Sequence, residues 1–319
     1  MIWLFRGADY PFMKYRQWAF GLSGLLILVT IISIIVKGGL EYSIDFTGGT
    51  LIQLDFEESI EAQRLRDALD DMPGLESNEV QRFGDPSDVV IRAQVPAGEE
   101  ELFGQRIEEH LRQAPELAGR SFEVLRTEAV GPKIGEELKR DALMAILYAM
   151  GFIMIYVAFR FDLNFGVAAI LTTLHDIVLS VGTFSLTGKE ISLSVVAAFL
   201  TIVGYSINDT IVVFDRIRED LKTMRRTPYE DLVNRAVNET LSRTILTGGT
   251  TLVVLLFLFF IGGEVIHDFA FALIIGILIG TYSSILIGAP LVVEWKHRIE
   301  GRGDGAASPK KPRKSKQPA

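Results

Sequence analysis

The stretch WAFGLSGLLILVTIISIIV, residues Trp18–Val36, contains 19 residues and no charged side chain. A run of about 20 apolar residues spans the ~30 Å hydrocarbon core of a bilayer. Five more charge-poor runs follow, and the six together hold 132 of the 319 residues: Ala142–Phe159, Leu163–Gly188, Ile191–Phe214, Thr244–Gly263 and Phe269–Val293. This apolar content excludes a wholly soluble globular protein, a nucleic-acid-binding protein and a disordered chain. The sequence predicts a polytopic α-helical membrane protein with six transmembrane helices in the lipid bilayer.

Acidic charge is concentrated between the first two runs. Residues 37–140 carry 12 basic and 23 acidic side chains, whereas the whole chain carries 32 and 40, a net charge of −8. We therefore expect an acidic water-soluble domain at residues 37–140, after a first span at residues 18–36. That span is longer than the apolar part of a signal peptide and lacks a cleavage site, so it is predicted to remain as an anchor. The chain has no cysteine, which excludes disulfides and thiolate metal sites.

Lysine and arginine near the ends of spans favour the cytoplasmic side of a membrane. The basic residues cluster at residues 1–17, in a loop at residues 215–243 between the fourth and fifth spans, and in a tail at residues 299–319. The opposite short loops hold only Lys189. We therefore expect both termini in the cytoplasm, the acidic domain outside, and spans two to six within residues 141–298. The basic, proline-rich tail has nothing to bury and is predicted to be disordered.

The acidic domain alternates between strand and helix patterns. Strands are predicted at Tyr42–Phe56, Val80–Phe83, Val89–Val95 and Ser121–Val130, with a turn at Gly84-Asp85-Pro86. One helix is predicted to start from an N-cap at Ser59, and a second has apolar residues at helical spacing from Leu102 to Leu111. This βαββαβ order predicts a ferredoxin-like fold.

Three ionisable residues interrupt the apolar runs, and each costs roughly 2.5–3.5 kcal/mol at the centre of a bilayer. They are His175 and Asp176 in the third span and Asp209 in the fourth. Polar residues recur around Asp176 at helical spacing, so this stripe is expected to face other helices: Thr172, Ser180 and Thr183. Ionisable residues inside spans mark proton relays and ion pathways. The alternative for His175 and Asp176 is a hydrogen-bonded pair that only fixes helix packing.

Asp209 lies near the cytoplasmic end of the fourth span, below a face of small and polar residues: Ser194, Ala198, Thr201, Tyr205 and Asn208. Arg243 opens the fifth span and is expected to approach Asp209. With His175 and Asp176, these two residues are our candidates for a proton relay. The alternative for Asp209 is a carboxylate that reaches out to the membrane interface. The alternative for Arg243 is an ordinary cytoplasmic anchor.

The sixth span carries Gly276, Gly280, Ser284 and Gly288 at four-residue intervals, a pattern that predicts close helix packing and no chemistry. A phosphate-binding loop is absent, because the stretch from Gly182 to Lys189 is one residue too long. The four histidines are isolated, which argues against a histidine metal site. We therefore expect no cofactor and no enzymatic activity, and the energy source has to lie elsewhere.

Four separated motifs resemble those of the SecD/SecF family of protein-export membrane proteins. They are YSIDFTGGT at Tyr42–Thr50, VGPKIGEEL at Val130–Leu138, VGYSINDTIVVFDRIR at Val203–Arg218 and NETLSRTILTGGTT at Asn238–Thr251. The likeness covers nearly the whole chain apart from its N-terminal dozen residues and its tail. The single ferredoxin-like domain is similar to the SecF side of the family.

This resemblance implies an accessory subunit of the bacterial Sec translocase in the cytoplasmic membrane. SecF pairs with SecD, and each supplies six helices of a twelve-helix unit of the RND superfamily type. That unit assists an unfolded preprotein at the SecYEG translocon and is driven by the proton motive force. The membrane-embedded aspartate and arginine of the family correspond to Asp209 and Arg243.

Two other classes of function remain open on the sequence. Half of an RND-type exporter of small molecules or lipids is the first, although a single βαββαβ domain leaves little room for a substrate cleft. An intramembrane aspartyl protease is the second, and its two carboxylates must come close enough to share a proton. Asp176 and Asp209 are expected to differ in depth by roughly two helical turns, ~10 Å at 1.5 Å per residue.

Overall fold

The computed structural model describes residues 7–73, 75, 77–82, 87–94, 100–224 and 226–304. The chain divides into two compact units. One comprises Lys37–Ala149 and Thr187–Ala197, and the other comprises the segments up to Val36, Met150–Leu186 and the chain from Ala198 onward. Of the tail that we expect to be disordered, residues 305–319 lie outside the described residues, and the last helix extends to Asp304.

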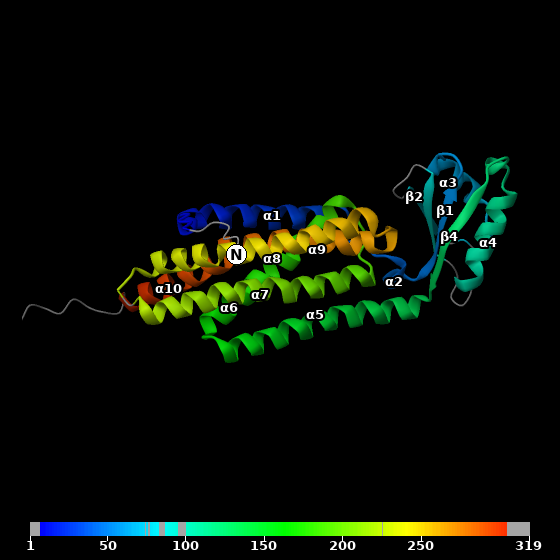
Figure 1. Ribbon diagram of the computed structural model, residues 1–319. Coiled ribbons are helices and arrows are strands. Elements are labelled where there is room, and N and C mark those ends of the chain that lie inside the picture. Colours follow the sequence, from blue (N-terminus) through cyan, green and yellow to red (C-terminus); the bar gives the residue numbers. More distant parts are fainter. Residues whose placement is uncertain are drawn as a thin grey trace, which may run out of the picture. The chain divides into compact units, whose positions relative to one another are not determined.

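The described part of the chain contains six long apolar helices, which confirms the predicted membrane architecture. Four of them are α1 (Arg16–Val36), α6 (Leu163–Thr187), α7 (Leu193–Thr223) and α8 (Tyr229–Ile261) (Figure 1). The second span, α5 (Pro132–Arg160), begins in the other unit, and its helix starts earlier than the expected boundary at residue 141. The sixth span combines α9 (Glu264–Ser283), a π-helical turn η3 (Ser284–Gly288) and α10 (Ala289–Asp304). Each helix is long and apolar enough to cross a bilayer.

The six spans differ in how much of each is covered by the rest of the protein. Most residues of α6, α7 and the sixth span are buried, whereas few residues of α1, α5 and α8 are. The three buried spans are also the ones with small and hydroxyl residues along their length, which let helices approach closely. Gly276 shows this directly, because a Cβ there would lie 2.2 Å from the Ile202 side chain of α7. Many hydroxyl residues of these three spans are therefore buried between helices.

The predicted loop at residues 215–243 is mostly helical. Helix α7 continues to Thr223 and α8 begins at Tyr229, so only a short connection separates them. Arg216 of α7 joins the two extensions through an ion pair with Glu239 of α8, and it also pairs with Asp220 on its own helix. Their apolar residues also form a buried core: Ile217, Leu232, Val233, Ala236 and Val237. The charge count that predicts a loop misses this amphipathic pattern, because most of the charged residues lie outside the apolar core, although Asp220 is buried.

The other unit contains the predicted βαββαβ domain, which confirms the ferredoxin-like fold. Its elements are β1 (Gly49–Phe56), α3 (Ala62–Asp70), β2 (Ser77–Arg82), β3 (Asp88–Gln94), α4 (Glu100–Gln113) and β4 (Phe122–Val130) (Figure 1). The sheet order is β2-β3-β1-β4, and every neighbouring pair is antiparallel. This order is that of two interlocked split βαβ units. The predicted turn at Gly84-Asp85-Pro86 lies outside the described residues.

One face of the sheet packs against α3 and α4. Apolar residues at helical spacing in both helices meet alternate strand residues in a single buried core: Ile52, Leu54, Leu65, Leu69, Val89, Ile91, Phe103, Ile107 and Leu111. Helix α3 begins at Ala62, with Glu61 as its N-cap, and not from the expected cap at Ser59. Ile60 explains the difference, because its side chain is buried in this core and holds the preceding residues out of the helix.

The predicted first strand is wrong over its first residues, where the chain forms the short helix α2 (Ile44–Thr47). Ser43 caps α2 by accepting a hydrogen bond from the Asp45 N–H at 3.3 Å. Ile44 then packs against Leu51 and Val90 on the second face of the sheet. Strand β1 is therefore buried on both faces. The run of apolar residues continues back into α2, so the sequence pattern makes the strand begin too early.

The loop between α6 and α7 is part of this unit. Tyr42 forms a parallel bridge with Ile191, and the Asp45 carboxylate accepts a hydrogen bond from the Leu193 N–H at 2.9 Å. Arg92 of β3 forms a largely buried ion pair with Glu190 of the loop. Strand β3, the segment around α2 and the loop between α6 and α7 therefore pack together within this unit.

Two glycines let the YSIDFTGGT and VGPKIGEEL segments pack on each other. Gly48 has a φ of 73°, and a Cβ at this position would lie 2.7 Å from the Cα of Pro132 at the start of α5. Gly135 approaches the carbonyl group of Phe46 so closely that a Cβ would lie 3.0 Å from it. Lys139 adds a contact over the Tyr42 ring at 4.1 Å. The base of the domain depends on this backbone contact.

We predict that Gly48→Ala destabilises the protein more than Gly38→Ala does. Both glycines have positive φ, and a Cβ in that conformation costs roughly 1–2 kcal/mol. Only Gly48 would in addition collide with backbone, since nothing lies within 4 Å of the position of a Gly38 Cβ. Thermal unfolding of the purified protein measures the difference. Equal midpoints for the two variants would contradict the packing role of Gly48.

Candidate functional site

Both predicted aspartates are buried within the helical unit. The Asp176 side chain is fully buried in α6, and Asp209 of α7 is 9% exposed. The polar stripe around Asp176 faces inward as predicted, because Thr172 and Ser180 are buried and Thr183 is half-buried. Buried carboxylates need hydrogen-bond partners, and in a membrane these have to come from neighbouring helices.

Asp176 receives its hydrogen bonds from three side chains. Ser206 of α7 and Ser283 of α9 both donate to Oδ2, the latter at 2.7 Å. The His175 Nδ1 lies 2.8 Å from Oδ1. The carboxyl group therefore joins three of the buried helical segments, and every one of these partners is neutral or able to be neutral.

His175 continues this network towards α1. Its Nε2 lies 2.9 Å from the Ser23 Oγ, which in turn lies 3.1 Å from the hydroxyl of Tyr282. The Tyr282 hydroxyl also donates to the carbonyl oxygen of Ala19 at 3.1 Å. A serine hydroxyl can donate or accept, so Ser23 can satisfy Nε2 whether or not it carries a proton. The network accommodates both protonation states of the imidazole.

Asp209 has a separate set of partners. Thr244 of α8 donates to Oδ1 at 2.8 Å, and Ser284 of η3 donates to Oδ2 at 2.7 Å. Both partners are hydroxyl groups, which can accept a hydrogen bond as readily as they donate one. The expectation of an interfacial carboxylate for Asp209 does not describe its position, because the side chain is enclosed between helices.

Arg243 lies close to Asp209 but is not its hydrogen-bond partner. Its side chain is exposed, and among the described residues it forms no ion pair with Asp209. The two charges are near enough to interact electrostatically. Adjacent helical residues point about 100° apart, so the residue turned towards Asp209 is Thr244. The direct partner is therefore the hydroxyl next to the predicted cation.

The predicted small-and-polar face of α7 is divided between two surroundings. Ala198 is buried, whereas Thr201 and Asn208 are exposed. Two hydroxyl oxygens flanking Asp209 in sequence, on Tyr205 and Thr210, are buried without a hydrogen-bond partner among the described residues. Native proteins rarely leave such atoms unsatisfied, and ordered water commonly fills the role.

Sequence reasoning missed Ser283 and treated Ser284 as a packing residue. The glycines of that stripe do pack closely, as the contact of Gly276 with Ile202 shows. The two serines instead bind the two carboxylates, one each. The signal that could have found them is a pair of hydroxyl residues in the middle of a span with no charge.

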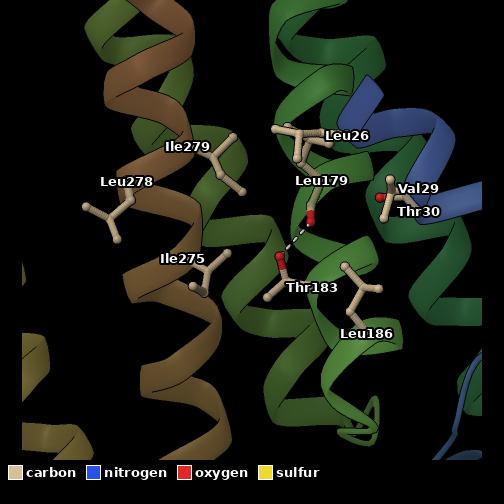
Figure 2. A pocket seen from close by; sticks show the side chains of 9 residues that line it. All are labelled: Leu26, Val29, Thr30, Leu179, Thr183, Leu186, Ile275, Leu278 and Ile279. Carbon is tan, nitrogen blue, oxygen red and sulfur yellow. Dashed lines mark hydrogen bonds between the residues drawn. The ribbon is translucent and has the colours of Figure 1, made fainter. Parts of the chain in front are cut away.

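The helical unit also contains an apolar cavity whose lining includes neither Asp176 nor Asp209. Its volume is about 220 Å³, and Figure 2 shows its apolar lining from α1, α6 and α9, with Thr183 donating to the Leu179 carbonyl. None of its lining residues is ionisable. Within the described ranges, no group of three or more histidine, aspartate and glutamate residues could hold a metal ion. The chemistry that the site offers is proton binding at carboxyl and imidazole groups.

Two family models match the chain. One describes the C-terminal part of the protein-export membrane proteins SecD and SecF and matches residues 110–298, and the other describes the SecD/SecF GG motif and matches residues 32–60. The range matched by the GG motif thus includes Gly48, whose backbone packs against Pro132 at the base of the domain.

Individual relatives agree with the family models. The protein translocase subunit SecF of Desulfurispirillum indicum is 44% identical over 90% of this chain and 92% of its own length. The subunit SecDF of Thermus thermophilus is 46% identical over 86% of this chain and 37% of its own length. A crystal structure of SecDF from that organism matches with a TM-score of 0.83 and 42% identity, over 93% of this chain and 40% of the solved chain. The chain therefore belongs to the SecD/SecF family of protein-export membrane proteins.

Proposed function

We propose that this protein is a multi-pass subunit of the Sec translocase in the bacterial cytoplasmic membrane, and that with SecD it uses the proton motive force to assist the passage of an unfolded preprotein through SecYEG. The translocase subunits among its relatives support the export role. One observation carries the energetic part: Asp209 is buried in a span and bound by two hydroxyl groups. Proton movement needs no covalent chemistry and no cofactor.

The hydroxyl partners of Asp209 suit a carboxyl group that changes its protonation state. An ion pair with an enclosed cation would hold the group permanently charged. Thr244 and Ser284 can instead donate to a carboxylate or accept from a carboxylic acid. Arg243, exposed nearby, supplies positive charge without enclosing the carboxylate. Its role in the proposal is to favour release of the proton, because a nearby positive charge stabilises the carboxylate.

The available energy is sufficient for a conformational change. One elementary charge that crosses the membrane gains ~2.3 kcal/mol per 100 mV. A few protons in each cycle would therefore bias a two-state equilibrium strongly. Asp176 and Asp209 lie on α6 and α7, and the loop that joins these helices is packed with the base of the βαββαβ domain through Glu190 and Arg92. This connection is the route by which we expect proton binding to act on the domain.

An exposed polar face supports pairing with SecD. Helices α7 and α8 expose several polar residues and a glycine, whose side chains and backbone lipid would solvate poorly: Thr201, Gly204, Asn208, Arg243, Thr247 and Thr250. Charged and polar residues in spans normally face protein or water. A second helical unit covering this face would shield them. The SecDF relative carries more than twice the length of this chain, as expected if both units are fused there.

The proposal includes an orientation of the chain in the membrane. The basic extensions of α7 and α8 and both termini are placed in the cytoplasm by the positive-inside rule, with the βαββαβ domain on the outer side. The exporter alternative gains nothing from the relatives described above, which are named as translocase subunits. For the protease alternative, Asp176 and Asp209 would have to share a proton, whereas each is bound by its own hydroxyl groups.

We predict that Asp209→Asn removes the proton-driven part of preprotein export. The amide keeps the size of the side chain but cannot release a proton. Release of preprotein across energised vesicles should fall to the level that wild type shows with an ionophore, and the ionophore should then have no further effect. Asp209→Glu should retain part of the response.

Asp215→Asn is the matched control, because Asp215 is exposed on the same helix and pairs with Arg160. It should respond to the ionophore as wild type does. If Asp209→Asn vesicles kept full ionophore-sensitive release, Asp209 would be a structural residue and the proposal would fail.

We predict that Gly204→Leu prevents SecD from copurifying. Gly204 is exposed on the polar face, and nothing within this chain lies within 4 Å of the position of a Cβ there. Added bulk would therefore obstruct a partner without disturbing this protein. Gly24→Leu is the control, since Gly24 is equally open on the apolar outer face of α1. Equal recovery of SecD with both variants would place the partner on another face.

A further inference from the structure

Three consecutive residues of the sixth span form hydrogen bonds with Asp176, with Asp209 and with the serine that binds His175. Tyr282 lies 3.1 Å from Ser23, the partner of His175. Ser283 donates to Asp176, and Ser284 donates to Asp209, each at 2.7 Å. Sequence neighbours on one helix thus bind two carboxyl groups that belong to two other helices.

The helix geometry changes at this point. Helix α9 ends at Ser283, and the π-helical turn η3 begins at Ser284. Short π-helical turns inside α-helices are rare and frequently lie at functional sites. Both serine side chains are fully buried, so their hydroxyls have no access to bulk solvent. Gly280, one turn earlier, brings this segment against Ser206, the other serine that binds Asp176.

Each serine has a second acceptor in reach. The Ser283 Oγ lies 3.1 Å from the carbonyl oxygen of Gly280, and the Ser284 Oγ lies 3.2 Å from that of Thr281. A hydroxyl group has one proton to donate. When a carboxylate binds a proton and becomes a donor itself, its serine can therefore turn its own proton to the helix carbonyl three residues earlier.

We propose that Ser283 and Ser284 are positioning residues that couple the two buried carboxyl groups, so that the protonation state of Asp209 alters that of Asp176. This inference rests on the proposed function and extends it to residues outside the predicted relay. A serine that turns to a preceding carbonyl competes with backbone hydrogen bonds and bends its helix. Because the serines are adjacent, a change in the turn at Ser284 moves Ser283 as well.

Few other groups can contribute to such coupling. His175 of α6 contacts Asp176 directly, and Arg243 of α8 acts on Asp209 electrostatically. Tyr282 of α9 joins the network through Ser23, and the buried Tyr205 lies one turn before Asp209 on α7. Helix α1 contributes the neutral Ser23. Asp176 and Asp209 share no direct hydrogen-bond partner among the described residues, so the adjacent serines provide the shortest covalent connection between their ligands.

The test is a pH titration of Asp176 by infrared difference spectroscopy, on the assembled complex in lipid vesicles. The Asp176 carboxyl band is assigned by its loss in Asp176→Asn. In a protein with both serines, Asp209→Asn should shift the midpoint of this titration. In Ser283→Ala with Ser284→Ala, adding Asp209→Asn should leave the midpoint unchanged. An Asp209→Asn shift that persists without the serines, or no shift with them present, would overturn the inference.

Ser180→Ala is the matched control, because Ser180 is equally buried but donates to the backbone carbonyl of Asp176 at 2.7 Å. The Asp209→Asn shift should survive in this background. Export assays on the same variants separate the two claims. If Asp209→Asn abolishes the ionophore-sensitive release while the serine substitutions leave the titration shift intact, only the coupling fails. If Asp209→Asn leaves release intact, the proposed function fails whatever the titration shows.

Discussion

A carboxyl group inside a membrane has to be satisfied by other parts of the protein, and this constraint organises the helical unit. Water is absent from the hydrocarbon core, and each unsatisfied polar group costs several kcal/mol there. Asp176 and Asp209 meet the requirement with hydroxyls from α7, α8 and the sixth span. Those hydroxyls reach the carboxyl groups only when the helices approach closely, which small residues such as Gly276 and Gly280 allow.

The same constraint explains why the partners are hydroxyls. A carboxylate bound by an enclosed cation would be satisfied in one protonation state only, whereas serine and threonine serve both. The network around His175 has the same property, since the Ser23 hydroxyl can donate to or accept from both His175 and Tyr282. A buried site with these partners keeps its hydrogen bonds whether or not the carboxyl group carries a proton.

In the βαββαβ domain, close contacts between backbone segments hold the elements together. Gly48 and Gly135 let the start of β1 and the start of α5 touch at the base of the βαββαβ domain. The loop between α6 and α7 joins this packed base through Ile191, Leu193 and Glu190. The helices that carry both carboxyl groups are thus continuous with the domain that would meet a preprotein.

Periodicity could predict the six spans and the βαββαβ order, because apolar runs and alternation report directly on burial. It could not predict α2, since β1 is buried on both faces and Ile44 resembles one more strand residue. Asp209 and Asp176 stand out by their charge, but their partners do not. Thr244 and not Arg243 turns towards Asp209, and a shift of one residue on a helix lies below the precision of a sequence pattern. Ser283 and Ser284 carry no charge, so only their position in the middle of a span sets them apart in the sequence.

The central claim is that Asp209 changes its protonation state while the protein works. Infrared difference spectroscopy of the assembled complex in sealed vesicles, before and after a proton gradient is imposed, tests this most directly. The account predicts a carboxyl band that changes with the gradient, disappears in Asp209→Asn and is unaffected in Asp215→Asn. A spectrum in which no Asp209 band responds to the gradient, in a complex that still exports preprotein in response to it, would contradict the account.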